Sequence, residues 1–433
     1  MTQTTTKVAE TTPQVVAPEP VQSPFYYVKK RLLKNKPAMV GLGIILFGIV
    51  IALLGYLIMP DSTPNANDSA PQIKKKPAGF RITMFRQRKN IDVEKVNLFQ
   101  KIFTGRESEY SITPITSYRI DENKLLAYVK MYGVAEEEEE HSIVDAVLYL
   151  FVGETAIVRA TTGVKNEDGN YHIDGNTITY ADENEKVQKI SKQELLRRFK
   201  SECIEERTYI LGTDESGRDM LSRLIFGFRI SLSIGVVAVF ISLMLGTTLG
   251  SIAGFFGGRT DAFVIWLMTV VWSIPSIMLV IAISLALQSR GIWVAFVAVG
   301  LTTWVEIARL VRGQILSIKK KTYIEAAGAL GLSNRRIIVN HILPNILGPL
   351  IVVMASNFAS AILTEAGLSF VGLGVQPPMP SWGSMIYEGF KNIGTTDSFH
   401  LIFYPSLFIS ILVLAFNLFG NGLRDAYDPT SQG

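Results

Sequence analysis

The chain has 433 residues, of which 48% are hydrophobic and only 18% are charged, whereas charged residues make up about 25% of an ordinary soluble protein. A single Cys excludes an internal disulfide framework, and with only four His it argues against a zinc module. The formal net charge of +4 is too small to indicate a nucleic-acid-binding protein. The deficit of charge instead indicates that much of the chain lies in lipid.

The first part of the chain combines a polar tail with a basic flank. Residues 1–24 are rich in Thr, Pro, Val and Gln and show no apolar period, which predicts a disordered cytoplasmic tail. Region 25–59 joins a flank rich in Lys and Arg to the first apolar span. Positive charge beside a span marks the cytoplasmic side of a membrane. The apolar stretch is longer than the core of a typical signal peptide and no A-x-A-like site follows it, which favours a retained anchor over a cleaved signal.

Six segments are long and apolar enough to cross a bilayer. A crossing helix needs about 20 apolar residues, because the hydrocarbon offers its backbone no hydrogen-bond partner. The alternative is six buried helices of a large soluble protein, but the near absence of charge in all six argues against it. With six crossings the basic connection after the fourth span is also cytoplasmic, so both termini are predicted inside. The predicted spans are 38–59, 230–254, 262–287, 291–311, 346–368 and 399–420.

A long segment of ordinary polarity separates the first two spans and is predicted to lie outside. A Pro- and Asn-rich linker, 60–79, would tether a small α+β domain over 80–205. An amphipathic segment along the outer surface, 206–229, would then lead into the second span.

Local patterns predict several elements within the outer domain. Polar and apolar residues alternate about an Asp-Gly pair in 171–180, which is a strong hairpin signal. A capping box at 191–194 predicts the start of a helix. Segments 124–132 and 143–161 resemble strands, and 92–103 resembles an amphipathic helix.

The run of acids at 136–140 admits two interpretations. A calcium site is one, but the run lacks the spaced oxygen ligands and the glycine of a calcium loop. A solvated loop is therefore favoured, and no metal site is predicted. Cys203 has no possible partner in the chain and is predicted to be inert.

Four glycines recur at every fourth position in and just after the second span. They predict a stripe of small residues on one helix face, where another backbone can approach closely, either in this chain or in a second one. The stripe consists of Gly246, Gly250, Gly254 and Gly258.

The basic connection after the fourth span predicts a helix–turn–helix in the cytoplasm. Residues 323–331 are typical of a short helix that ends at a glycine. Ser333 can cap a second helix over 334–343, and Pro344 would limit its continuation before the fifth span. Small residues on the first arm would let the groove of a partner close tightly around it.

This connection resembles the EAA loop of permease subunits in ATP-binding cassette (ABC) importers. The similarity extends over 312–344, although His341 stands where the pattern usually carries Ile. The His-Ile-Leu-Pro ending is similar to that of the dipeptide and oligopeptide permease branch. The resemblance implies that the loop couples the chain to an ATPase through Glu325, Ala326, Ala327, Gly331, Leu343 and Pro344.

Three further stretches, which begin at Leu211, Thr364 and Asn421, resemble the same branch. Together they extend the resemblance to 25–59 and 208–429, and the chain is most similar to the second permease subunit. The implied fold is the type I ABC importer permease, an all-α polytopic membrane protein with six transmembrane helices. Its core would be 230–429, with the α+β extra-cytoplasmic domain as an unusual insertion between helices 1 and 2.

The resemblance also implies a function. The chain would form the translocation path of an ATP-driven importer for dipeptides, oligopeptides or similar small solutes in the bacterial cytoplasmic (inner) membrane. Its implied partners are a second permease, two ABC ATPase subunits, an extracytoplasmic solute-binding protein and the peptide substrate. No G-x-x-x-x-G-K-[ST] phosphate loop is present. The chain is therefore expected to be no enzyme and to bind no cofactor, with ATP and Mg²⁺ on the ATPases.

Within the fifth span, Glu365 and Asn357 are the candidates for the translocation path or an outer gate. A charge at membrane depth indicates function by default. Glu365 would bind the amino terminus of a peptide or, as we favour, take a structural role at the outer rim. Pro275 is predicted to kink the third span, with Ser273 as a compensating donor. The charged residues of 214–229 are expected to pair with one another.

Three other functions are weighed against the importer of peptides. A related transporter could carry a non-peptide solute such as a metal chelate. An exporter or ion-coupled carrier would usually place ionisable residues at the midplane, where these spans have almost none. A membrane-anchored envelope sensor that uses 80–205 would need neither six spans nor an EAA loop.

Overall fold

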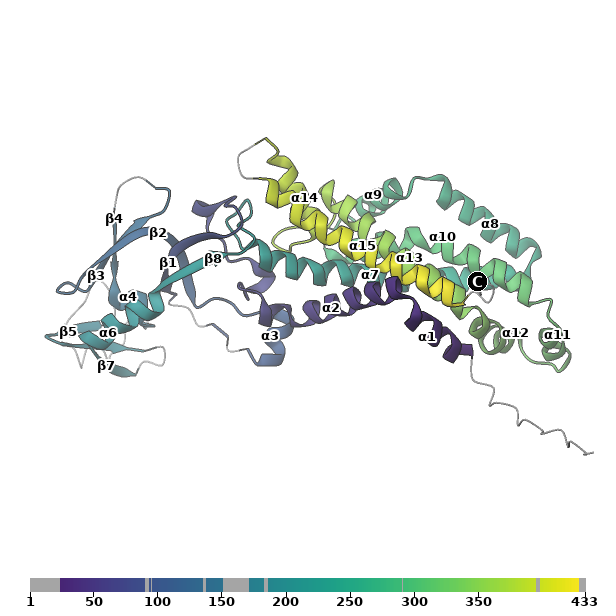
Figure 1. Ribbon diagram of the computed structural model, residues 1–433, viewed down its shortest axis with the longest axis horizontal. Coiled ribbons are helices and arrows are strands. Elements are labelled where there is room, and N and C mark those ends of the chain that lie inside the picture. Colours follow the sequence, from purple (N-terminus) through teal and green to yellow (C-terminus); the bar gives the residue numbers. More distant parts are fainter. Residues whose placement is uncertain are drawn as a thin grey trace, which may run out of the picture.

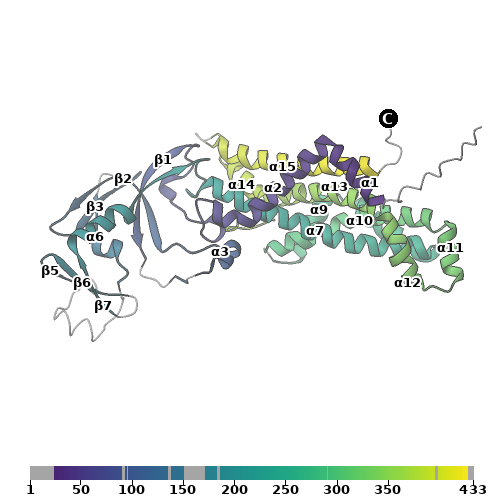
Figure 2. The same ribbon diagram turned by 60° about the horizontal axis from the view of Figure 1, so that its bottom comes forward.

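The nearly charge-free stretches form a bundle of helices, whereas the polar segment between the first two stretches forms sheets (Figure 1). The sheets lie at one end of an elongated molecule, and a pair of short helices, α11 (Thr322–Ala329) and α12 (Asn334–Ile337), lies at the other (Figures 1 and 2). The computed structural model describes residues 24–89, 93–94, 96–134, 138–150, 171–182, 186–289, 291–394 and 398–427.

Five helices in the described residues are long and apolar enough to cross a membrane, and a bent pair brings the number to six if it counts as one span. Their positions agree with the predicted spans one, two, four, five and six. A short helix, α1 (Pro24–Lys34), precedes the first of them. The five are α2 (Lys36–Ile58), α7 (Met220–Phe256), α10 (Ile292–Ile318), α13 (Leu343–Phe370), which continues α12, and α15 (Phe399–Tyr427).

The predicted third span is broken into α8 (Gly258–Ser273) and α9 (Ser276–Ala286), which meet at 94°. Pro275 precedes α9 with an extended backbone (ψ 128°), so the break lies where a proline ring prevents the helix from continuing. The bend is far larger than the simple kink that Pro275 predicted. The Ser273 hydroxyl donates to the Val270 carbonyl at 2.8 Å, within its own helix.

Glycines allow α7 and α10 to pack with their backbones in close approach. A Cβ atom added to Gly250 would lie 2.5 Å from the carbonyl oxygen of Ala308. Gly246 and Gly254 likewise lie against α10. The stripe therefore packs inside this chain, and only Gly258 has open space around it.

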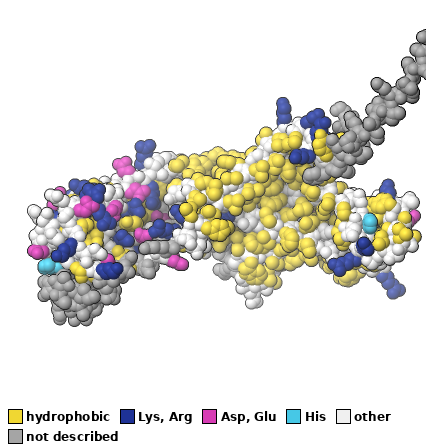
Figure 3. All heavy atoms as spheres, turned by 90° about the horizontal axis from the view of Figure 1, so that it is seen from below, with side chains coloured by type: hydrophobic (Ala, Val, Ile, Leu, Met, Phe, Trp, Pro, Cys, Tyr) yellow, Lys and Arg dark blue, Asp and Glu magenta, His cyan; other side chains and the backbone are white. Residues whose placement is uncertain are grey.

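Exposed apolar side chains cover the middle of the molecule, between two ends that carry charged groups (Figure 3). On α2 they include Phe47 and Leu53, which are 66% and 53% exposed. An apolar belt of this kind would be a liability in water and suits contact with lipid.

The outer domain consists of two antiparallel sheets. The larger has the order β4-β3-β2-β1-β8 and the smaller has the order β5-β6-β7. The predicted hairpin is present as β5 and β6, and helix α6 begins after Ser191, whose hydroxyl accepts from the Glu194 N–H. The elements are β1 (Phe80–Arg88), α3 (Leu98–Thr104), β2 (Tyr110–Asp121), β3 (Leu126–Met131), β4 (Glu138–Ser142), α4 (Ile143–Val147), β5 (Tyr171–Asp174), β6 (Thr177–Ala181), β7 (Val187–Ser191), α6 (Lys192–Arg198) and β8 (Ile204–Tyr209).

Two predictions for this domain are wrong in the residues that the structure describes. The strand-like segment 143–161 begins as the helical turn α4, because the Ser142 hydroxyl caps it and its apolar side chains all turn into the core. Part of that segment, 151–161, lies outside the described residues. The acid run also differs, since Glu138, Glu139 and Glu140 belong to strand β4 rather than to a loop. Backbone pairing with β3 holds them there while their side chains stay in solvent.

The linker and the surface segment also differ from their predictions. Within 60–79, Ala66, Ala70 and Ile73 are buried, so this stretch packs against the protein instead of acting as a free tether. The Lys75 N–H donates to the Asp214 carbonyl at 2.9 Å, which fixes the linker to the loop that follows β8. The segment 206–229 is divided between β8, that loop and the first turns of α7, and it forms no separate amphipathic helix.

Candidate functional site

The predicted coupling loop forms the end of the molecule farthest from the sheets (Figure 2). Helix α11 ends before Gly331, whose φ of +76° is accessible mainly to glycine. Helix α12 then continues through a π-helical turn at 338–342 into α13. Pro344 does not interrupt this helix, because it lies in the first turn of α13, where a missing N–H is tolerated.

The coupling residues divide between two faces of α11. Ala327 is buried with Ile324 against the bundle, whereas Glu325 and Ala326 are exposed. Leu330 is 82% exposed, although it is a large apolar side chain. Sequence analysis missed Leu330, and its only signal there was an apolar residue directly before the helix-ending glycine. An exposed Leu beside small residues is the arrangement expected of a surface that a partner covers.

A buried cluster of charges lies at the opposite end of the bundle, beside the sheets. The carboxylate of Asp214 lies 2.7 Å from the guanidinium of Arg218 and 3.0 Å from that of Arg223. Glu388, on α14 (Trp382–Lys391), completes the cluster at 3.6 and 3.8 Å from the same two arginines. Burial raises the pKa of Glu388, and the arginines oppose that rise. The cluster fastens the start of α7 to α14.

The other charged residues predicted to pair in 214–229 have separate partners. Asp219 caps α7, since its carboxylate accepts from the Ser222 N–H at 2.8 Å. Arg229 donates to the Ile102 carbonyl at 3.0 Å, and its guanidinium lies over the ring of Phe103. Sequence analysis missed Glu388, because no spacing rule connects it to Asp214.

Glu365 and Asn357 are both buried inside the chain. Glu365 is fully buried and Asn357 is 1% exposed, so neither lines an open surface of this subunit. One carboxylate oxygen of Glu365 accepts from the Ser369 hydroxyl at 2.7 Å. Ser369 in turn accepts from the Val375 N–H and the Ser381 hydroxyl. This geometry favours the structural role of Glu365, as an anchor of the loop between α13 and α14.

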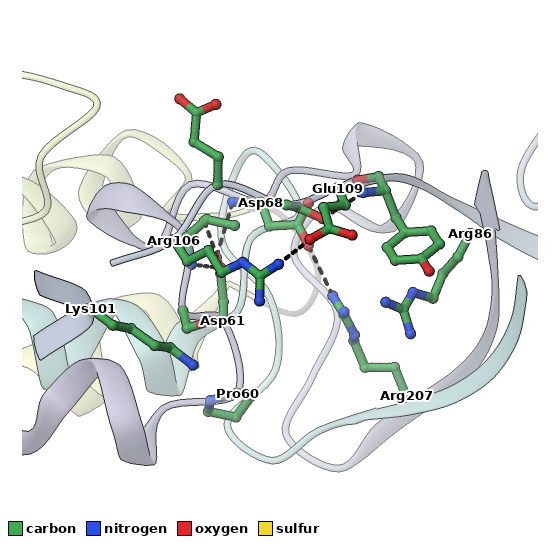
Figure 4. Close-up of a pocket in the computed structure, with 13 residues that line it drawn as sticks. Pro60, Asp61, Asp68, Arg86, Lys101, Arg106, Glu109 and Arg207 are labelled. Atoms are coloured by element: carbon green, nitrogen blue, oxygen red, sulfur yellow. Dashed lines mark hydrogen bonds and ion pairs between the residues drawn. The ribbon is translucent and has the colours of Figure 1, made fainter. Parts of the chain in front are cut away.

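A polar cavity of about 290 Å³ separates the end of α2 from the outer sheet (Figure 4). Four carboxylates and four cations line it, so their charges balance. Arg207 pairs with Asp68 at 3.3 Å, and Arg106 pairs with Glu109. Burial raises the pKa of Asp68, with Asp61 adding to the rise and Arg207 opposing it. The first pair joins strand β8 to the segment that follows α2, whereas the second lies within one loop of the outer domain.

Cys203 is expected to resist maleimide at pH 8 in the folded protein. Its side chain is buried and donates to the Ala146 carbonyl at 3.4 Å. Burial raises the pKa of this thiol from 9.0 to about 12, so the reactive thiolate is scarce at that pH. A folded-state pKa above the ordinary one means that this site contributes full stability below pH 9 and loses it as the pH rises toward 12. Mass spectrometry should find no adduct before denaturation and one adduct afterwards, and a native adduct would contradict this placement.

Comparisons with known proteins match the two regions that flank the outer domain. The family model described as "Binding-protein-dependent transport system inner membrane component" matches residues 246–432. A second model, "N-terminal TM domain of oligopeptide transport permease C", matches residues 23–77.

Curated relatives agree with these matches. The oligopeptide transport system permease protein OppC of Bacillus subtilis is 41% identical over 218 residues, which are 50% of this chain and 70% of the relative. The dipeptide permease DppC of the same organism is 41% identical and covers 50% and 68% of the two chains. The glutathione transport system permease protein GsiD of Pectobacterium atrosepticum is 42% identical and covers 51% and 72%.

Solved structures include an inward-facing MetNI methionine ABC transporter, at 20% identity and a TM-score of 0.41, which covers 48% of this chain and 97% of that one. The identity to the curated permeases extends over about 70% of their length. The chain therefore belongs to the family of binding-protein-dependent transport system inner membrane components.

Proposed function

We propose that this chain is a permease subunit of an ATP-driven importer for dipeptides, oligopeptides or similar small solutes. The observation that carries the proposal is the surface formed by Glu325, Ala326 and Leu330 at the end opposite the outer domain. This surface combines a small side chain with an exposed apolar one, as a surface covered by an ATPase would. The related permeases for oligopeptides, dipeptides and glutathione support the class of solute.

The complete importer would contain this chain, a second permease, two ABC ATPases and a solute-binding protein. ATP and Mg²⁺ would bind to the ATPases, whose closure would press on α11 and α12. Because α12 and α13 form one continuous helix, that movement would reach the outer end of the bundle. The chain itself would hold no cofactor and would catalyse no reaction.

We also propose that both termini and α11 lie in the cytoplasm of a bacterial inner membrane, with 60–229 outside. The basic residues beside α2 and around α11 support this orientation. Protease added to spheroplasts should cut the outer domain and spare tags at both termini. Cleavage of either terminal tag would contradict the proposed orientation.

The function is tested with the purified complex in proteoliposomes loaded with ATP. Uptake of radiolabelled dipeptide should require ATP inside, the binding protein outside and this chain. Parallel assays with a longer peptide, glutathione and a metal chelate would identify the preferred solute. ATP hydrolysis without transport of any of these solutes would contradict the proposal.

A further inference from the structure

Two ionisable side chains on α10 are exposed, Glu306 near the middle of the helix and Arg309 about one turn closer to its end. Glu306 and Arg309 both lie on the surface of this subunit. Glu306 is near the middle of α10, roughly 18 Å before its end at Ile318 for a rise of about 1.5 Å per residue. The packing of α7 gives an independent estimate, since Gly246 contacts Ile307 and lies roughly 15 Å before the end of α7. That is about half of a 30 Å hydrocarbon core.

The other ionisable side chains of the spans have different surroundings in the described residues. They are buried, such as Glu365, or lie near a helix end, or are paired, such as Arg312, whose guanidinium is 2.6 Å from Asp261. Glu306 and Arg309 form no ion pair within the described part of the chain. Placing an exposed charge in the hydrocarbon has a high free-energy cost. This face of α10 is therefore expected to contact a partner or a water-filled path.

A hollow of about 340 Å³ lies at these side chains. Trp272 of α8, with Val305 and Leu310, forms its apolar wall. The guanidinium carbon of Arg309 lies 3.6 Å from the centre of the Trp272 ring. Stacking occupies the face of the guanidinium and leaves its edge, which carries the N–H donors, free to bind a carboxylate through two hydrogen bonds.

The spacing of Glu306 and Arg309 along α10 lets their charged groups reach both ends of a short zwitterion. Residues three apart on a helix have Cβ atoms about 5–6 Å apart. The ends of an extended dipeptide are separated by about 7 Å, from a maximum of about 3.6 Å per residue. A hollow of this volume is also at the lower end of ordinary small-molecule sites, which begin at about 300 Å³.

We propose that Glu306, Arg309 and Trp272 form a subsite on the wall of the translocation path that binds the charged ends of a zwitterionic dipeptide. Glu306 receives the ammonium group and Arg309 receives the carboxylate, while Trp272 excludes water from one side. This inference rests on the proposed function and adds to it a solute-contacting site. Sequence analysis assigned no solute-binding role to either charged residue.

The test uses the complete complex in proteoliposomes. Glu306→Gln and Arg309→Gln should each lower dipeptide uptake at least tenfold and raise the solute concentration for half-maximal uptake. ATP hydrolysis stimulated by the loaded binding protein should stay within twofold of the unsubstituted complex, because the coupling and docking surfaces are unchanged. Arg309→Lys, which keeps the charge but loses the two-pronged geometry, should be intermediate. Gln314→Ala, on the same helix but outside the hollow, is the matched control and should transport normally.

The outcomes separate this subsite from the proposed function. An unsubstituted complex that transports nothing overturns the proposed function, and the subsite falls with it. Normal uptake by both Gln variants overturns the subsite alone. Variants that no longer assemble with the second permease, including Arg309→Lys, would make the pair an intersubunit contact and also overturn it.

Discussion

Leu330→Asp is expected to abolish ATP-dependent uptake by the assembled importer while leaving the chain folded in the membrane. Leu330 is 82% exposed, so the substitution removes little packing within the chain. At an interface the same side chain would be buried, which is worth about 1.5–3 kcal/mol for a leucine, and a carboxylate there adds a desolvation cost. The affinity for the ATPase should therefore fall by about tenfold or more. Co-purification of the ATPases and solute uptake measure the two effects.

Glu325→Arg and Gly331→Asp should also lower ATP-dependent uptake and the affinity for the ATPase. Glu325→Arg reverses a charge on the exposed face of α11, and Gly331→Asp places a side chain on a backbone with φ of +76°. Lys320→Ser, just before α11, serves as the control, because it is exposed but lies outside this surface. Full uptake by a variant that carries both Leu330→Asp and Glu325→Arg would contradict the assignment of this surface to ATPase coupling.

Arg223→Met is expected to lower the stability of the permease by about 3–5 kcal/mol, the usual effect of removing one partner from a buried ion pair. Arg223 is 1% exposed and lies within 4 Å of both Asp214 and Glu388, so its loss would leave Arg218 alone to balance two carboxylates. Thermal unfolding of the detergent-solubilised complex would measure the change.

Two comparisons identify the origin of that loss. Adding Glu388→Gln to Arg223→Met should recover part of the stability, because it removes the one carboxylate in excess and leaves Asp214 paired with Arg218. Arg119→Ala breaks the exposed pair with Glu138 and should leave the melting temperature unchanged. Equal losses from Arg223→Met and Arg119→Ala would show that burial of the cluster contributes nothing.

The positions of the spans could be predicted because the cause is local. A long stretch without charge is visible in the sequence. Because lipid offers the backbone no hydrogen-bond partner, such a stretch must form a helix when it crosses the membrane. The hairpin at β5 and β6 could be predicted for the same reason, since a short turn contains its own signal. The bend of 94° between α8 and α9 could not, because Pro275 specifies where a helix breaks and the surrounding packing decides the angle.

Features of the candidate sites that depend on residues far apart in the sequence could not be predicted. Glu388 and Asp214 are more than 170 positions apart in the sequence and share the same two arginines. Only the packing of α14 brings them together. The exposure of Leu330 and of Glu306 depends on which helix face turns inward. Strand β4 was missed because its acids show no apolar alternation and its pairing comes from the backbone of β3.

The outer domain leaves the bundle and returns to it through two neighbouring strands. Phe80 of β1, at the start of the insertion, pairs with Tyr209 of β8, at its end. A segment whose ends are adjacent can be exchanged for a short turn with little change in the separation of the flanking helices, since closing a short gap has a small entropic cost. The outer domain is therefore inserted at a two-stranded stem, and exchanging it would disturb the permease only at that stem and where α3 touches α2 and α7.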